Sequence, residues 1–126
     1  MGHIGFTPQF KKKFKVEGEN SKELKKLLNL AKKIEEAGAF SIVLECINKK
    51  SSKKITQEIK IPTIGIGSSQ YCDGQVLVTD DILGLSGFYP RFVKKYANLD
   101  QIIKSAVKNF KKEVQKGIFP KNINSF

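Results

Sequence analysis

Apolar side chains recur at helical spacing near the start of the chain, and the residues between them are mostly lysines and glutamates. Over residues 21–37 the apolar positions are three or four residues apart, which predicts an amphipathic helix with one buried stripe. Either Asn20 or Ser21 can cap the amino end of this helix with its side chain. Gly38 suits the left-handed conformation that ends many helices.

Two continuous apolar runs, at residues 40–46 and 62–67, are typical of parallel strands that are covered on both faces. A helical pattern at about 52–59 separates them, and a longer helical pattern extends from about 100 to 116. Glycine and proline follow this last pattern and mark its end. Strands that alternate with helices in this way predict α/β architecture with a parallel sheet.

The stretch at residues 74–84 fits two interpretations. Residues 75–79 have the composition of a strand, whereas Asp73 followed by apolar residues can cap and open a helix. Periodicity does not decide between the two for so short a stretch. We expect a helix here, followed by a short strand at about 91–96.

The carboxyl end of the first apolar run carries a candidate catalytic residue. Side chains alternate between the faces of a strand, so Ile42 and Leu44 share one face and Glu45 lies on the other. In the second run Gly65 and Gly67 fall on the face with small side chains, and we expect them to leave space for Glu45. This edge of the sheet is where α/β folds place their active sites. In the alternative interpretation, Glu45 starts a loop and pairs with a surface lysine.

Composition narrows the classes of function. A chain of 126 residues with 40% hydrophobic side chains can form a core, and no apolar run reaches the roughly 20 residues that span a bilayer. The 23 basic and 12 acidic residues give a net charge of +11, yet Arg91 is the only arginine. This favours a solvated lysine surface over a nucleic-acid site. Cys46 and Cys72 match no disulfide or zinc pattern, which fits a soluble cytoplasmic protein.

Five motifs follow one another along the chain. They are GHIGFTPQ at 2–9, FKVEG at 14–18, AGAF and VLEC within 37–46, IPTIGIG at 61–67 and DGQVLV at 73–78. In this order they resemble the C-terminal half of the ketopantoate hydroxymethyltransferase (3-methyl-2-oxobutanoate hydroxymethyltransferase) family. The resemblance extends from Gly2 to about Pro120.

The resemblance implies a fold and an activity. The family has a (β/α)8 TIM-type barrel with parallel strands, so residues 1–126 would form a single partial domain, the C-terminal half-barrel. Family members use Mg2+ and assemble as homo-oligomers, usually decamers. They transfer a one-carbon unit from the folate co-substrate 5,10-methylenetetrahydrofolate to the keto acid 3-methyl-2-oxobutanoate, which gives ketopantoate for pantothenate biosynthesis.

The resemblance also assigns roles to particular residues. The glutamate of the VLEC motif is the family's proton acceptor, which is Glu45 in this sequence. The histidine of the first motif lines the substrate pocket, which points to His3, although a histidine bonded only to backbone is an alternative. Gly65 and Gly67 would provide room beside that pocket. The family's metal ligands belong to its N-terminal half, so no metal ligand is assigned in this chain.

Length predicts that the chain is only part of the enzyme. A (β/α)8 barrel needs about 250 residues, so we expect a C-terminal fragment, or one piece of a split gene, that is inactive alone. Asp80 and Asp81 would be poor joint metal ligands. The lysine run at 11–13 departs from the family pattern.

Two alternative functions stay open: a basic α/β module that binds a polyanion or nucleic acid, and a non-catalytic partner of a full-length paralogue.

Overall fold

The computed structural model describes residues 1–10 and 15–126, which divide into two compact units, Met1–Leu77 and Val78–Phe126. The run at 11–13 lies outside the described residues. The first unit contains β1 (Gly2–Gly5), α1 (Ser21–Glu36), β2 (Ile42–Glu45), α2 (Lys49–Glu58), β3 (Thr63–Ile66) and β4 (Gly74–Gln75). The second contains α3 (Thr79–Leu83), α4 (Leu99–Gln115) and the short 3-10 helix η1 (Asn122–Asn124). The prediction of a single partial domain stays a prediction.

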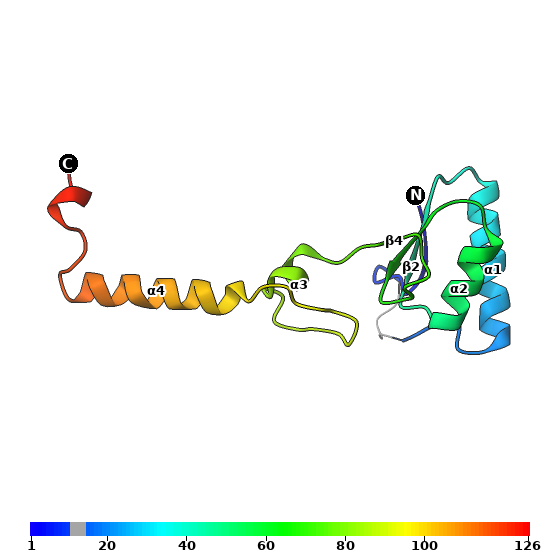
Figure 1. The fold of residues 1–126 in the computed structure, drawn as a ribbon, viewed down its shortest axis with the longest axis horizontal. Coiled ribbons are helices and arrows are strands. Elements are labelled where there is room, and N and C mark those ends of the chain that lie inside the picture. The colour runs from blue at the N-terminus through cyan, green and yellow to red at the C-terminus, as the bar shows by residue number, and fades with distance from the viewer. Residues whose placement is uncertain (11–14) are drawn as a thin grey trace. The chain divides into compact units, whose positions relative to one another are not determined.

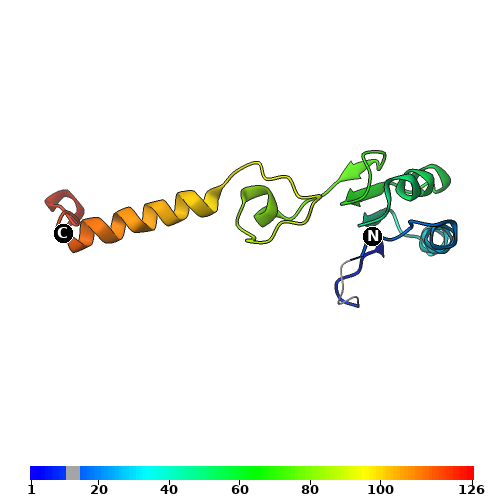
Figure 2. The same cartoon turned by 90° about the horizontal axis from the view of Figure 1, so that it is seen from below.

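The four strands of the first unit form one parallel sheet in the order β1-β2-β3-β4. Helices α1 and α2 lie side by side against one face of this sheet (Figures 1 and 2). The predicted α/β fold with parallel strands is therefore confirmed. The expectation of cover on both faces is not met within this unit, because Val43 and Ile64 on the second face are only half-buried.

The core lies between the sheet and the two helices. Ile42 and Leu44 of β2 are fully buried there, together with Ala31 of α1 and Ile55 of α2. The buried positions of α1 are four residues apart along the helix, as the predicted stripe requires. Burial of these aliphatic groups, worth about 25 cal/mol per Å2, is the main force that holds the unit together.

Local signals at the ends of α1 behave as the sequence predicts. Of the two candidate caps, Asn20 is the N-cap, and its Oδ1 accepts a hydrogen bond from the N–H of Glu23 at 2.9 Å. Gly38 follows the helix with a φ of +87°. Helix α2 begins earlier than predicted, because Asn48 caps it by accepting the N–H of Lys50.

The stretch at 74–84 differs from the expected single helix. Gly74 and Gln75 form β4, which pairs with β3, and the helix α3 begins only at Thr79. Asp73 caps no helix, because its carboxylate accepts the N–H of Thr63 at 2.8 Å. The expected strand at 91–96 is also wrong, since the structure, which describes all of these residues, has none there.

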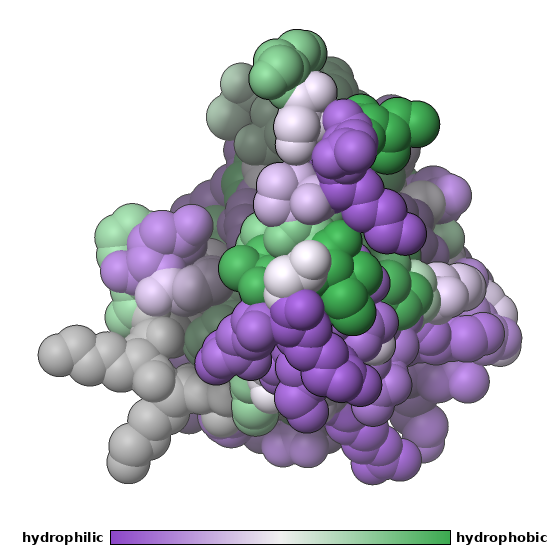
Figure 3. Space-filling view, turned by 90° about the vertical axis from the view of Figure 1, so that its left-hand side faces the viewer, coloured by the Kyte–Doolittle hydropathy of each residue, from purple (hydrophilic) through white to green (hydrophobic). Residues whose placement is uncertain are grey.

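Helix α4 has the predicted amphipathic pattern and ends before Gly117, whose φ is +66°. None of its residues is buried, and the apolar residues Ile102 and Val107 are 61% and 60% exposed. Figure 3 shows hydrophobic groups reaching the molecular surface among hydrophilic ones. Within the described residues, no helix is both long enough and apolar enough to cross a membrane.

Candidate active site

The carboxyl ends of three neighbouring strands meet at one edge of the sheet. Glu45 is the last residue of β2, and it pairs with Gly5 at the end of β1 and with Ile66 at the end of β3. Parallel α/β sheets bind their ligands at this edge, because the loops that follow the strands surround it. Glu45 therefore stands at the centre of a candidate site.

His3 and Glu45 lie on the same face of the sheet and contact each other. His3 pairs with Val43, which is two residues before Glu45, so both side chains project from one face. His3 Nε2 lies 3.0 Å from Glu45 Oε2. The side chain of Glu45 is 16% exposed and that of His3 35% exposed, so the pair is sheltered but open to a ligand. The partner of Glu45 is thus a histidine, and no lysine among residues 1–10 and 15–126 pairs with its carboxylate.

The backbone turns sharply after Glu45. Cys46 has a φ of +53°, a left-handed value that is costly for a residue with a side chain. Two backbone hydrogen bonds hold it there: its N–H donates to Ile66 O at 2.9 Å, and its carbonyl accepts the N–H of Glu17 at 3.0 Å. Burial, with a smaller contribution from the Glu45 charge, raises the pKa of the Cys46 thiol to about 11. This thiol is therefore unsuited to act as a nucleophile at neutral pH.

Ser68, just after β3, ties together the two sides of this turn. Its hydroxyl donates to the carbonyl of Leu44 and accepts the N–H of Ile47 at 3.1 Å. Leu44 and Ile47 flank Glu45 and its left-handed neighbour. A single hydroxyl from the loop after β3 thus fixes the backbone that carries the candidate catalytic residue.

Gly5 allows β1 to approach this backbone closely. It has a φ of +92°, and a Cβ at this position would lie 2.1 Å from Glu45 O and 2.8 Å from Ile47 Cγ1. The next residue, Phe6, donates its N–H to the same Glu45 carbonyl at 2.8 Å. Only glycine fits here, since any side chain would push β1 away from Glu45.

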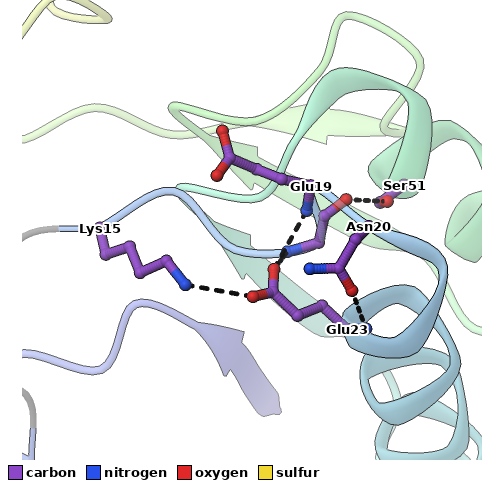
Figure 4. A network of polar contacts seen from close by, with 6 residues as sticks. Lys15, Glu19, Asn20, Glu23 and Ser51 are labelled. Atoms are coloured by element: carbon purple, nitrogen blue, oxygen red, sulfur yellow. Dashed lines mark hydrogen bonds and ion pairs between the residues drawn. The ribbon is translucent and has the colours of Figure 1, made fainter.

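A network of polar contacts holds the segment at 15–20, which leads into α1 (Figure 4). Glu23 Oε2 accepts the N–H groups of Gly18 and Glu19, at 3.0 and 3.1 Å. Its Oε1 pairs with Lys15 Nζ at 3.1 Å, and the Ser51 hydroxyl donates to the carbonyl of Gly18. The hydrogen bond from Lys15, followed by that from Glu19, lowers the pKa of Glu23. This segment is therefore held where it passes the turn that follows β2.

Comparison with known proteins identifies the family to which this sheet belongs. The model of the family described as ketopantoate hydroxymethyltransferase matches residues 1–122. The chain belongs to the ketopantoate hydroxymethyltransferase family. The resemblance predicted from the five motifs is thus confirmed.

Individual members of the family are about 50% identical to this chain. Proteins named 3-methyl-2-oxobutanoate hydroxymethyltransferase from Thermotoga maritima, Clostridium botulinum and Syntrophomonas wolfei are 52%, 53% and 48% identical over 130 residues. The alignments cover 100% of this chain and 48%, 47% and 47% of those proteins. The chain therefore spans about half the length of the curated relatives it matches.

The two glycines predicted to make room for Glu45 do not both lie beside it. Gly65 pairs with Leu44 and therefore shares the helix-covered face, where an added Cβ would lie 2.9 Å from the Gln75 side chain and 3.1 Å from Cys72 Sγ. The residue opposite Glu45 is instead Ile66. The expected placement of Gly65 is wrong because alternation within one strand does not reveal its register with the next. Gly67 follows β3 with a φ of +61°.

The described residues do not form a metal site. Among residues 1–10 and 15–126 there is no group of three or more histidines, cysteines or carboxylates that could hold a metal ion. Mg2+ prefers oxygen ligands, and of the contacting pair only Glu45 offers side-chain oxygens, because His3 has nitrogen donors alone. The described residues therefore place a carboxylate beside an imidazole without a set of metal ligands around them.

The motifs indicate Glu45 and His3 as candidates but do not indicate the residues that hold them. Gly5 and Ser68 act through contacts between strands, so single-strand patterns do not reveal them. One signal was available for Gly5, since glycine at the end of a strand often marks a close approach between two backbones.

Proposed function

We propose that this chain is the C-terminal part of a hydroxymethyltransferase that acts on 3-methyl-2-oxobutanoate. In this proposal the four parallel strands are half of a (β/α)8 barrel. Each edge strand, β1 and β4, pairs with one other described strand, which leaves an edge for a further strand on either side. The complete enzyme would be a cytoplasmic homo-oligomer that produces ketopantoate for pantothenate biosynthesis.

The contact between His3 and Glu45 is the observation that carries this proposal. A carboxylate at the carboxyl end of a parallel strand, 3.0 Å from an imidazole nitrogen, is arranged for proton transfer. If His3 carries its proton on Nε2, it donates to Glu45 Oε2 and orients the carboxylate. Within the described part of the chain Oε1 accepts no hydrogen bond, so that oxygen can receive a proton from a substrate.

The proposed reaction begins with removal of a proton from C3 of 3-methyl-2-oxobutanoate, the carbon next to the keto group. The C3–H bond breaks, its electron pair forms the enolate, and the proton moves to Glu45 Oε1. Water cleaves the two bonds that join the one-carbon unit to N5 and N10 of 5,10-methylenetetrahydrofolate, which releases tetrahydrofolate and leaves the one-carbon unit as formaldehyde. The enolate carbon then bonds to the formaldehyde carbon, and the resulting alkoxide takes the proton back from Glu45 Oε1 to become the new hydroxyl group.

The enolate needs stabilisation that the described residues do not supply. Magnesium would act as a Lewis acid on the keto acid, and we expect its ligands in the N-terminal half of the enzyme. Because the described residues do not fit such a metal site, the chain contributes only Glu45 and His3 to the proton transfer. Gly67 and the loop after β3 would line the substrate side of the pocket.

A chimaera tests this function. The N-terminal half of the Thermotoga maritima relative, fused to this chain, should form ketopantoate from the two substrates, whereas this chain alone should not. Formation of product by the purified chain alone, or a folded chimaera that forms none, would contradict the proposal. Circular dichroism and the assembly size of the chimaera establish that it is folded.

Variants of His3 in the same chimaera test the proton-transfer pair. His3→Phe removes the imidazole nitrogen that lies 3.0 Å from Glu45 Oε2, and we expect kcat to fall about tenfold, the value of one hydrogen bond to a charged group. His3→Gln keeps a donor and should retain more activity than the phenylalanine variant. Equal kcat values for the two variants would mean that the contact does not orient Glu45.

A further inference from the structure

One loop of the second unit combines aromatic and basic side chains. Between residues 82 and 99 there are three cations and four aromatic rings, and there is no aspartate or glutamate. The net charge of this stretch is therefore +3. The seven residues are Phe88, Tyr89, Arg91, Phe92, Lys94, Lys95 and Tyr96.

The loop is closed at its base, so it is a defined structure. The N–H groups of Tyr96 and Ala97 both donate to Ile82 O, at 2.9 and 3.2 Å. Gly84 lies against the other end of the loop with a φ of +77°, and a Cβ there would be 2.6 Å from Ala97 O. Closure at the base is typical of compact functional surface loops.

Two lysines of the loop lie over two of its tyrosine rings. Lys95 Nζ is 4.5 Å from the ring centre of Tyr89, and Lys94 Nζ is 5.0 Å from that of Tyr96. Among the described residues no carboxylate pairs with either lysine. Each ammonium group is thus held beside an aromatic face while its charge is unneutralised.

Exposed rings in the same loop offer surfaces for stacking. Phe88 is 76% exposed and Tyr96 is 68% exposed, and Arg91 is exposed as well. Aromatic rings that become buried against a bound ligand stabilise the complex with that ligand, and flat ligands can stack on them. The combination fits a ligand that carries both an aromatic ring and carboxylates.

We propose that residues 85–96 bind the aminobenzoyl-glutamate portion of the folate co-substrate. The ring of that portion would stack on Tyr96 or Phe88, and its carboxylates would pair with Lys94 and Lys95. This inference rests on the proposed function, which requires a folate co-substrate. It adds a binding site for that co-substrate outside the β1–β2 pair.

A small ligand suits the loop better than nucleic acid does. Specific nucleic-acid proteins commonly neutralise several phosphates with an extended basic surface, whereas this loop carries only three cations. Only one of the three is arginine, the residue best suited to phosphate and base edges. Two lysines beside two rings match the two carboxylates and the single ring of aminobenzoyl-glutamate.

Titration of this chain with p-aminobenzoyl-L-glutamate tests the inference without turnover. Lys94→Gln combined with Lys95→Gln should weaken binding about tenfold, as expected for the loss of two exposed ion pairs. The matched control is Lys108→Gln with Lys111→Gln on α4, which removes the same charge without touching the loop. It should change the Kd less than twofold. Free glutamate, which lacks the ring, should bind at least tenfold more weakly.

Several outcomes overturn the inference. Absence of p-aminobenzoyl-L-glutamate binding at millimolar concentration would overturn it. So would a control variant, Lys108→Gln with Lys111→Gln, that raises the Kd as much as the Lys94 and Lys95 variant does. Tighter binding of a twelve-nucleotide single-stranded RNA, lost in the Lys94 and Lys95 variant, would assign the loop to nucleic acid instead.

A kinetic arm separates this inference from the proposed function. In the chimaera the Lys94→Gln and Lys95→Gln pair should raise the KM for 5,10-methylenetetrahydrofolate about tenfold with kcat little changed. An unchanged KM overturns the loop site and leaves the roles of Glu45 and His3 intact. An inactive chimaera contradicts the proposed function, and the titration still decides on the loop.

Discussion

At the scale of single residues, the candidate site depends on where a few backbone atoms are held. Glu45 reaches His3 because β1 lies close to β2, and that closeness depends on Gly5. Glu45 and His3 could be predicted as candidates from the sequence, since both belong to motifs that resemble a family. Gly65 was misplaced, because the pairing of two strands depends on contacts that neither strand encodes alone.

Substitution of Gly5 by alanine should be far more costly than an ordinary glycine substitution. Gly38 provides the control, since its φ of +87° resembles the +92° of Gly5 but nothing lies within 4 Å of an added Cβ. Gly38→Ala should cost only backbone strain, about 1 kcal/mol. Gly5→Ala adds a clash with Glu45 O and should cost about 3 kcal/mol or more.

Chemical denaturation of the two alanine variants measures this difference. The Gly5→Ala variant should also lose the close contact of His3 with Glu45, visible as a shift in the imidazole NMR signals. Equal stability of the two variants would show that the approach of β1 to Glu45 is not tight.

At the scale of elements, local patterns predicted the helices better than the short strands. Helix α1 has an apolar stripe, an N-cap residue and a glycine after its end, all within its own sequence, so the local sequence was sufficient to predict it. Strand β4 has only two residues and exists because Gly74 and Gln75 pair with β3. A helical pattern at 74–84 could not reveal this, because the deciding hydrogen bonds come from residues ten positions away.

Asp73 should make the junction of β3 and β4 sensitive to acid. The N–H of Thr63 is the main cause that lowers the pKa of Asp73, and the Thr63 hydroxyl adds to it. A lowered pKa in the folded state means that the carboxylate stabilises the fold above its unfolded pKa of about 4. That contribution is lost as the pH falls through the lower, folded pKa.

The variant Asp73→Asn isolates this contribution. At pH 7 its free energy of unfolding should be about 1 kcal/mol lower than that of the wild type, the value of an exposed charge-assisted hydrogen bond. This difference should vanish in strong acid, where Asp73 is protonated. Glu36→Gln, an exposed change in the same unit, should alter stability little at either pH. If the free energy of unfolding differed between Asp73→Asn and the wild type by the same amount at all pH values, the charge of Asp73 would not be what stabilises the fold.

At the scale of the whole molecule, the described residues place the contact between His3 and Glu45 on a parallel sheet whose two outer strands, β1 and β4, each pair with one described strand. The family is known from residues 1–122, but the chain spans about half of the relatives it matches. Motif order revealed this family from sequence alone. The division into two compact units was not predicted, since the patterns along the chain describe elements and not the contacts between them.

The central claim is that Glu45 accepts the C3 proton of the keto acid. The most direct test is the rate at which the chimaera exchanges that proton for deuterium in the absence of folate. Glu45→Gln should slow exchange by 100-fold or more, roughly the contribution of a general base, while the helix-surface change Glu58→Gln should leave it unchanged. Wild-type exchange in a folded Glu45→Gln variant would contradict the claim.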